Sequence, residues 1–195
     1  MFCKEMDFPE VPEHFLEESD FTMVTNVEDI GYSLKHEYKG QLLNSTSYKV
    51  YRSKNDEFKN WFSKNLFVLP SHQPIEFQKQ QARFGTIGTH IVHSDIVRTF
   101  AVNYVFETGG DNVTTNWYKE RGFPLYRTKS YGGKQADSGS VKYDDLECLD
   151  SVVLKKNRWY ILDVRVLHDV QNIINCRKSL TISFMHPIHQ FLGIK

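Results

Sequence analysis

The chain has 195 residues, of which 40% are apolar and 14% aromatic, so it is long enough to bury one full hydrophobic core. Its 24 lysines and arginines balance its 24 aspartates and glutamates, which excludes the global basic field that drives binding to nucleic acid or to anionic membranes. We therefore expect one domain over residues 1–195, without a nucleic-acid or membrane partner.

The amino terminus, MFCKEMDFPE, carries acidic residues and a proline where a signal peptide needs a basic start and an apolar run. No uninterrupted apolar stretch approaches the length of a membrane span. Cys3, Cys148 and Cys176 form neither a CxxC pair nor an even set, which is typical of a reducing compartment. We expect a cytoplasmic protein whose cysteines are ordinary thiols.

Two segments near the amino terminus have helical character. They are residues 11–19 (VPEHFLEES) and residues 55–67 (NDEFKNWFSKNLF), and the second places Phe58, Trp61 and Phe62 near helical spacing after an Asn-Asp start. Between them, residues 46–53 (TSYKVYRS) alternate and predict a strand. We expect residues 1–80 to form a mainly helical support region.

From residue 81 onward the sequence is rich in β-branched and aromatic residues, interrupted by Gly, Asn and Asp. The turns between the apolar runs are too short for helical crossovers, which favours an antiparallel sandwich or jelly roll over residues 81–187. One long segment without a pattern, residues 127–145, is inserted into it, and we expect a lid there. The predicted strands cover residues 89–95, 98–107, 112–118, 146–154, 158–170 and 177–186.

The predicted strand THIVHSD contains His93 and Asp95, separated by one residue. Residues two apart on a strand point to the same face with Cα atoms roughly 6.6 Å apart, so both side chains can reach one metal ion. By the same alternation, His90 should point to the other face. Chance readily produces one His-x-Asp pair in a chain of this length, so a half-buried structural histidine is an equally open interpretation.

The carboxyl-terminal segment VLHDVQNIINCRKSLTISF adds His168, Arg177 and Ser179 to this pair. With them the sequence resembles the Fe(II)- and 2-oxoglutarate-dependent oxygenase superfamily, whose signature is His-x-Asp, a distant His and then Arg-x-Ser. The resemblance covers residues 80 to 185. It implies a double-stranded β-helix, and we expect the amino-terminal helices to pack on one of its sheets.

The resemblance also implies a function for each matching residue. His93, Asp95 and His168 would bind Fe(II) on one face of an octahedron and leave sites for 2-oxoglutarate and dioxygen. Arg177 would bind the far carboxylate of 2-oxoglutarate through its fork of donors, with Ser179 beside it on the same strand face. Asn103 would also face the cosubstrate if the strand of His93 continued without a bulge.

The expected activity is that of a dioxygenase, an oxidoreductase that couples decarboxylation of 2-oxoglutarate to succinate with hydroxylation of a small molecule or a protein side chain. A cupin-like metal-binding protein that does not use 2-oxoglutarate, as a lyase, an isomerase or a sensor, is the alternative. Arg177 discriminates between the two, since only the oxygenase needs a buried carboxylate clamp. We expect Arg98 to lie on an outer face or to pair with an acidic side chain.

Overall fold

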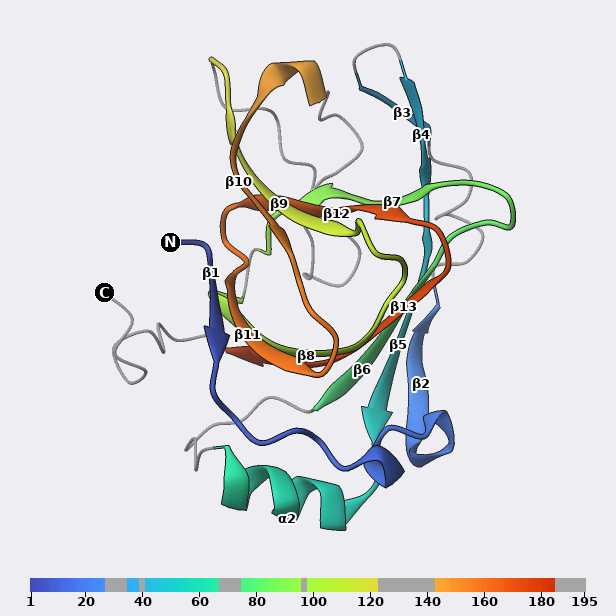
Figure 1. The fold of residues 1–195 in the computed structure, drawn as a ribbon, viewed down its shortest axis with the longest axis vertical. Helices are drawn as coiled ribbons and strands as arrows, with labels where there is room; N and C mark the ends of the chain where they lie inside the picture. Colours follow the sequence, from blue (N-terminus) through green and yellow to red (C-terminus); the bar gives the residue numbers. More distant parts are fainter. Residues whose placement is uncertain (27–34, 39–40, 67–74, 96–97, 123–142, 185–195) are drawn as a thin grey trace.

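The computed structural model describes residues 1–26, 35–38, 41–66, 75–95, 98–122 and 143–184, which form two β-sheets that face each other (Figure 1). The larger sheet contains, in spatial order, β1 (Cys3–Met6), β11 (Arg158–Asp163), β8 (Phe100–Thr108), β13 (Cys176–Phe184), β6 (Glu76–Gln81), β5 (Ser47–Ser53) and β2 (Phe21–Asn26). The smaller sheet contains β10 (Leu146–Val153), β9 (Thr114–Glu120), β12 (Leu167–Ile173), β7 (Gly88–His93), β4 (Gln41–Ser45) and β3 (Lys35–Tyr38).

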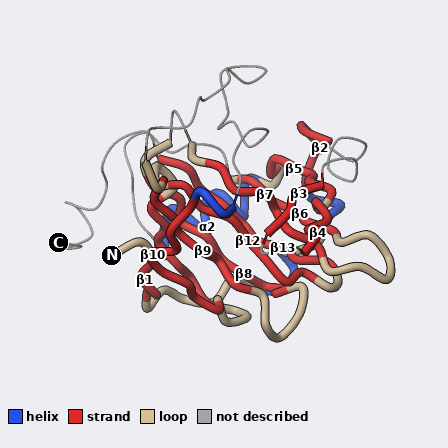
Figure 2. Tube along the Cα trace, turned by 90° about the horizontal axis from the view of Figure 1, so that it is seen from above, coloured by secondary structure: helices blue, strands red, loops and turns tan. Residues whose placement is uncertain are grey.

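The order of the strands is that of a jelly roll. From β6 to β9 the chain alternates between the larger and the smaller sheet, and it alternates again from β10 to β13. Neighbouring strands are antiparallel, except that β4 and β7 are parallel. The predicted double-stranded β-helix is therefore confirmed. Figure 2, seen from above, shows that strands make up most of the described trace.

Helix α2 (Asp56–Asn65) covers the outer face of the larger sheet, as predicted (Figure 1). It begins where the Asn55 side chain accepts hydrogen bonds from the backbone N–H groups of Glu57 and Phe58, at 2.9 and 3.2 Å. Phe58 and Phe62, one turn apart, are buried against residues of the sheet. No helix in the described ranges is both long and apolar enough to cross a membrane.

The helix predicted over residues 11–19 is wrong. The structure has two short 3₁₀ helices there, Glu13–Phe15 and Glu18–Asp20, and neither has a side-chain cap. The ring of Phe15 instead packs against Phe58, with ring centroids 5.1 Å apart. One turn suffices to bury this ring, and a longer helix would gain no further apolar contact from its acidic residues.

Residues 1–80 differ from the predicted helical region, because they contribute the strands β1 to β6 as well as α2. The strand predicted over residues 46–53 is confirmed as β5. The run 158–170 was predicted as one strand but forms β11 and β12, which lie in different sheets. The side chain of Asp163 accepts a hydrogen bond from the backbone N–H of Arg165 at 3.1 Å, a local turn that ends β11.

The predicted lid, residues 127–145, falls mostly outside the described residues. Its described end is a 3₁₀ helix, Tyr143–Asp145, in which Tyr143 is buried. The Tyr143 hydroxyl donates a hydrogen bond to Asp169 of β12 at 2.7 Å. This bond fixes the point at which the chain re-enters the smaller sheet.

Side chains of β8 alternate between two cores. Tyr104, like its even-numbered neighbours, packs with α2 on the outer face of the larger sheet. Ala101 and Val105 point the other way and pack with Trp117 of β9, in the space between the two sheets. Odd positions of this strand therefore face the interior of the jelly roll, up to a bulge opposite Lys178 and Ser179.

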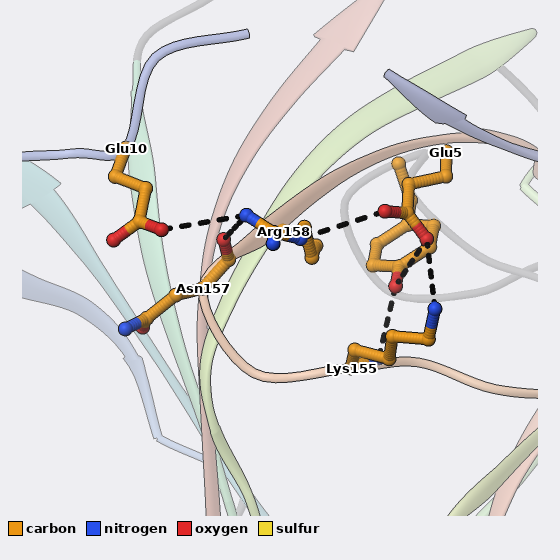
Figure 3. Close-up of polar contacts among 6 residues, drawn as sticks. Glu5, Glu10, Lys155, Asn157 and Arg158 are labelled. Atoms are coloured by element: carbon orange, nitrogen blue, oxygen red, sulfur yellow. Dashed lines mark hydrogen bonds and ion pairs between the residues drawn. The ribbon is translucent and has the colours of Figure 1, made fainter. Parts of the chain in front are cut away.

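The segment before β2 is tied to the larger sheet around Arg158 (Figure 3). The Arg158 guanidinium lies between two carboxylates, 3.5 Å from Glu5 and 3.3 Å from Glu10. These ion pairs are exposed and each contributes little. The Trp159 indole adds a hydrogen bond to the carbonyl of Pro9 at 2.8 Å, and its ring is buried beside α2. Together these contacts hold the first ten residues across β11.

Candidate metal and cosubstrate site

The structure brings His93 and His168 together. They are direct register partners on β7 and β12, and their ring centroids lie 4.3 Å apart. His168 Nδ1 lies 2.9 Å from the carbonyl oxygen of Val166. Because a carbonyl oxygen can only accept a hydrogen bond, Nδ1 carries the proton and donates it. This bond leaves Nε2 of His168 unprotonated and able to bind a metal ion.

His90 lies on the same face as His93, which corrects the prediction that it points away. Two residues separate His90 from His93, but a single residue separates their partners Val170 and His168 on β12. The extra residue is a β-bulge, and it cancels the alternation of faces. The rings of His90 and His93 consequently lie with their centroids 5.0 Å apart.

Asp95 follows the end of β7 and is held by Arg98. The Arg98 guanidinium contacts both carboxylate oxygens, with Nε 3.0 Å from Oδ2 and Nη2 3.1 Å from Oδ1. Within the part of the chain that the structure describes, no three His, Cys, Asp or Glu side chains are gathered closely enough to bind a metal ion. The structure thus pairs the two histidines and turns the carboxylate of Asp95 to an arginine, which agrees with the prediction that Arg98 pairs with an acidic side chain.

The donors present fit a divalent ion of the predicted kind. Two imidazoles bound side by side to one octahedral ion, each through a nitrogen about 2.1 Å away, have ring centroids about 4.6 Å apart. The observed 4.3 Å between His93 and His168 is close to this value. Burial, with His93 beside it, lowers the pKa of His168 to about 3, and Asp95 is near enough to oppose this shift. The imidazole is therefore neutral at physiological pH, as a ligand must be.

Arg177 is buried in the same interior. It lies on β13 and is 5% exposed, and its Nη1 donates to Gln80 Oε1, in the register partner on β6, at 3.0 Å. Burial lowers the pKa of Arg177 to about 10, which still leaves the guanidinium charged at neutral pH. A buried guanidinium whose described ion pairs include no carboxylate is costly, so the position favours an anionic ligand.

Ser179 and Thr181 share the interior face with Arg177. Leu180 and Ile182, between and beyond them, pack in the outer core with α2, so the alternate positions point toward the smaller sheet. Both hydroxyl residues are fully buried. Among the described residues, the Thr181 hydroxyl has no hydrogen-bond partner.

Asn103 faces this interior as well, although the assumption behind that prediction was wrong. The strand of His93 does not continue: β7 ends in the smaller sheet and β8 begins in the larger one. Asn103 reaches the interior because it lies between Ala101 and Val105 on β8. It is the register partner of Thr181, and its buried Oδ1 likewise has no hydrogen-bond partner in the part of the chain that the structure describes. Two neighbouring buried polar atoms with unused hydrogen-bonding capacity make this a place that favours a polar ligand.

Tyr48, which we did not predict as a site residue, lies between the histidines of the smaller sheet and the larger sheet to which it belongs. Its ring, from β5 of the larger sheet, contacts His90 of the smaller sheet with centroids 4.8 Å apart. Burial lowers the pKa of His90 well below its ordinary value, and the nearby His93, His168 and Arg177 add to the shift. His90 therefore lies near both the histidine pair and Arg177. The alternation of residues 46–53 places Tyr48, Val50 and Arg52 on one face, but does not tell which face is inward.

No protein-family model matches the chain, and a comparison with curated proteins finds no match. Among solved structures, the chain is similar to Escherichia coli ycfD, with a TM-score of 0.47 and 10% identity over 98% of this chain. The chain spans about half of that protein, 52% of its length.

Two further solved structures are similar to the chain. One is a Pseudomonas putida prolyl-4-hydroxylase, with a TM-score of 0.41, 10% identity, and coverage of 94% of this chain and 92% of that one. The other is an oxidoreductase of the 2OG-Fe(II) oxygenase family from Burkholderia pseudomallei, with a TM-score of 0.38, 12% identity, and 87% of each chain covered.

Proposed function

We propose that this protein is an Fe(II)- and 2-oxoglutarate-dependent oxygenase. The observation that carries the proposal is the pairing of His93 with His168 in the interior of a jelly roll that also buries the charged Arg177. Asn103 Oδ1 and the Thr181 hydroxyl, which no described residue hydrogen-bonds, lie on the same interior face of the larger sheet. Metal ligands, an anion-binding cation and free polar groups are what a metal-chelating keto acid requires.

In this proposal His93, Asp95 and His168 hold the iron. Bound there with 2-oxoglutarate, iron would supply the activation of dioxygen that oxidises a substrate C–H bond while the keto acid loses carbon dioxide and becomes succinate. The bond from His168 to the Val166 carbonyl fixes the ring so that Nε2 faces the site. The protein otherwise positions the reactants and keeps bulk water out.

Arg177 would bind the far carboxylate of 2-oxoglutarate. Its guanidinium is charged, buried and held in place by Gln80, so its orientation is fixed before the ligand arrives. Ser179 would donate a further hydrogen bond to the same carboxylate. Asn103 and Thr181 have hydrogen-bonding capacity that described protein groups leave unused, and the cosubstrate would satisfy it.

We propose hydroxylation of a small molecule or of a protein side chain as the reaction. The first test measures succinate release from 2-oxoglutarate by protein reconstituted with Fe(II) without oxygen and then exposed to air. Uncoupled turnover reveals the class of enzyme before its substrate is known. We expect succinate from the wild type and none from His168→Ala.

A matched control is His14→Ala, which removes an exposed histidine far from the paired rings. It should release succinate at the wild-type rate. If the wild type binds a divalent ion through His93 and His168 but neither binds 2-oxoglutarate nor releases succinate, the protein is a cupin-like metal-binding protein instead. If it binds no divalent ion, both functions are wrong.

A further inference from the structure

The contact between Arg98 and Asp95 suggests a role for Arg98 at the metal site. This inference rests on the proposed function. Its guanidinium occupies both oxygens of the Asp95 carboxylate, at 3.0 and 3.1 Å, in the bidentate arrangement that makes arginine–carboxylate pairs strong. The Asp95 side chain is 9% exposed and the Arg98 side chain 30%, so water screens the pair only in part.

The backbone on both sides of this pair is fixed. The N–H of Asp95 donates to the carbonyl of Val164 at 2.7 Å. The N–H of Thr99, next to Arg98, donates to the carbonyl of Phe184 at 2.8 Å, and Val164 in turn donates to Thr99 at 3.3 Å. These bonds hold the main chain at Asp95 and at Thr99, so rotation of the Asp95 and Arg98 side chains is the simplest route by which the carboxylate can change partners.

The Asp95 carboxylate has two possible partners, the Arg98 guanidinium and a metal ion. His93, two residues before Asp95, pairs with His168, yet the three predicted ligands are not gathered in the described structure. We propose that Arg98 is a positioning residue that holds Asp95 while the site lacks metal and gives up the carboxylate when a divalent ion binds. Metal binding then exchanges an ion pair for a coordination bond, and Arg98 lowers the affinity for the ion.

Two electrostatic effects act in the same direction. Arg98 offsets the charge of Asp95, which would otherwise attract the ion, and its own charge repels the ion. A unit charge about 5 Å from a divalent ion, even with the screening of water, changes the binding constant about tenfold. Removal of the Arg98 charge should therefore tighten metal binding by at least that factor.

The test titrates Co²⁺ into metal-free protein by calorimetry, with the visible spectrum of bound Co²⁺ as a second measurement. Arg98→Gln should bind about tenfold more tightly than the wild type. Arg98→Lys keeps the charge and should return the affinity toward that of the wild type. His168→Ala should abolish the Co²⁺ spectrum in every background, which shows that the site under study is the proposed one.

Arg165→Gln is the matched control. Arg165 makes the same bidentate contact with Asp163, at 3.1 and 2.8 Å, on the nearby connection between β11 and β12, and the Asp163 side chain is 11% exposed. This variant should bind Co²⁺ with wild-type affinity. An equal or larger gain in Arg165→Gln would mean that net charge alone acts, and would overturn the assignment of Arg98.

Unchanged or weaker binding by Arg98→Gln would also overturn it, since Arg98 would then be irrelevant to the ion or would support Asp95 in the metal-bound protein. Thermal unfolding of each metal-free variant shows whether the fold is retained. If Arg98→Gln fails to fold, Arg98→Lys still tests the proposal. A lower Co²⁺ affinity of Arg98→Lys than of the wild type would contradict competition between Arg98 and the ion for Asp95. Absence of a Co²⁺ site in the wild type would instead refute the proposed function.

Discussion

Replacement of Arg177 by lysine separates cosubstrate binding from metal binding. Both side chains are cationic, but an ammonium is a point charge and cannot reproduce two parallel hydrogen bonds to a carboxylate. Arg177 is 5% exposed and its Nη1 is already engaged by Gln80, so water cannot substitute for the lost donor. A hydrogen bond to a charged group contributes roughly 1.5–3 kcal/mol, which corresponds to a dissociation constant for 2-oxoglutarate that is about 10- to 100-fold higher.

The assay is calorimetric titration of 2-oxoglutarate into Mn²⁺-loaded protein without oxygen, for the wild type and Arg177→Lys. The matched control is Arg158→Lys, at the first residue of β11 and half-exposed between Glu5 and Glu10. It should leave the affinity unchanged, and Mn²⁺ binding should be the same in all three proteins. Equal affinity of the wild type and Arg177→Lys for 2-oxoglutarate would refute the assigned role of Arg177.

Three further predictions concern stability. Phe58→Ala should lower the free energy of unfolding by about 3–5 kcal/mol in a denaturant titration, because it empties a fully buried position between α2 and the sheet. A loss below about 1 kcal/mol would show that the helix contributes little to the fold. Tyr143→Phe removes a 2.7 Å hydrogen bond to the buried Asp169 carboxylate and should cost about 1.5–3 kcal/mol in the same titration, whereas no loss would mean that the other donors suffice. Burial raises the pKa of Asp169 to about 6, although Asn116, Tyr143, Gln171 and Tyr118 donate to it. An unfolded aspartate titrates near pH ~4, so the folded state retains a proton that the unfolded state has lost. The contribution of Asp169 to stability should fall by up to ~3 kcal/mol as the pH rises from 4 to 6, and Asp169→Asn should lack this slope. Identical slopes for the two proteins would contradict the raised pKa.

The sequence predicts the fold well where alternation is regular. Along β8 and β13, aromatic and branched residues alternate with small or polar ones. The structure places the two sets on opposite faces of the sheet, as the period of two predicts. The strands β1 to β4 and β6 were missed. Residues such as EFQKQQ in β6 have one strong apolar side chain, Phe77, because their other face lines a polar interior. Polar alternation of this kind is hard to distinguish from a loop.

The candidate site was predictable in its residue types but not in its local geometry. The resemblance to the oxygenase superfamily implied that His93, His168 and Arg177 belong together. The orientation of His90 depends on a bulge, which the sequence between His90 and His93 does not reveal. Tyr48 lies more than forty residues before His90 in sequence, and only the pairing of the strands brings the two rings into contact. Contacts between distant segments of this kind cannot be obtained from local patterns.

Strand β1 lies at one edge of the larger sheet and pairs with β11 from Cys3 opposite Leu162 to Met6 opposite Trp159. Strand β11 carries a nearly continuous buried run, RWYILD, whose backbone would present open hydrogen-bonding groups if β1 were detached. Such an edge is a template on which another copy of the chain can add a strand. The four residues of β1, with the exposed charges of Lys4 and Glu5, end the sheet in a form that resists further pairing, so the short first strand keeps this edge covered.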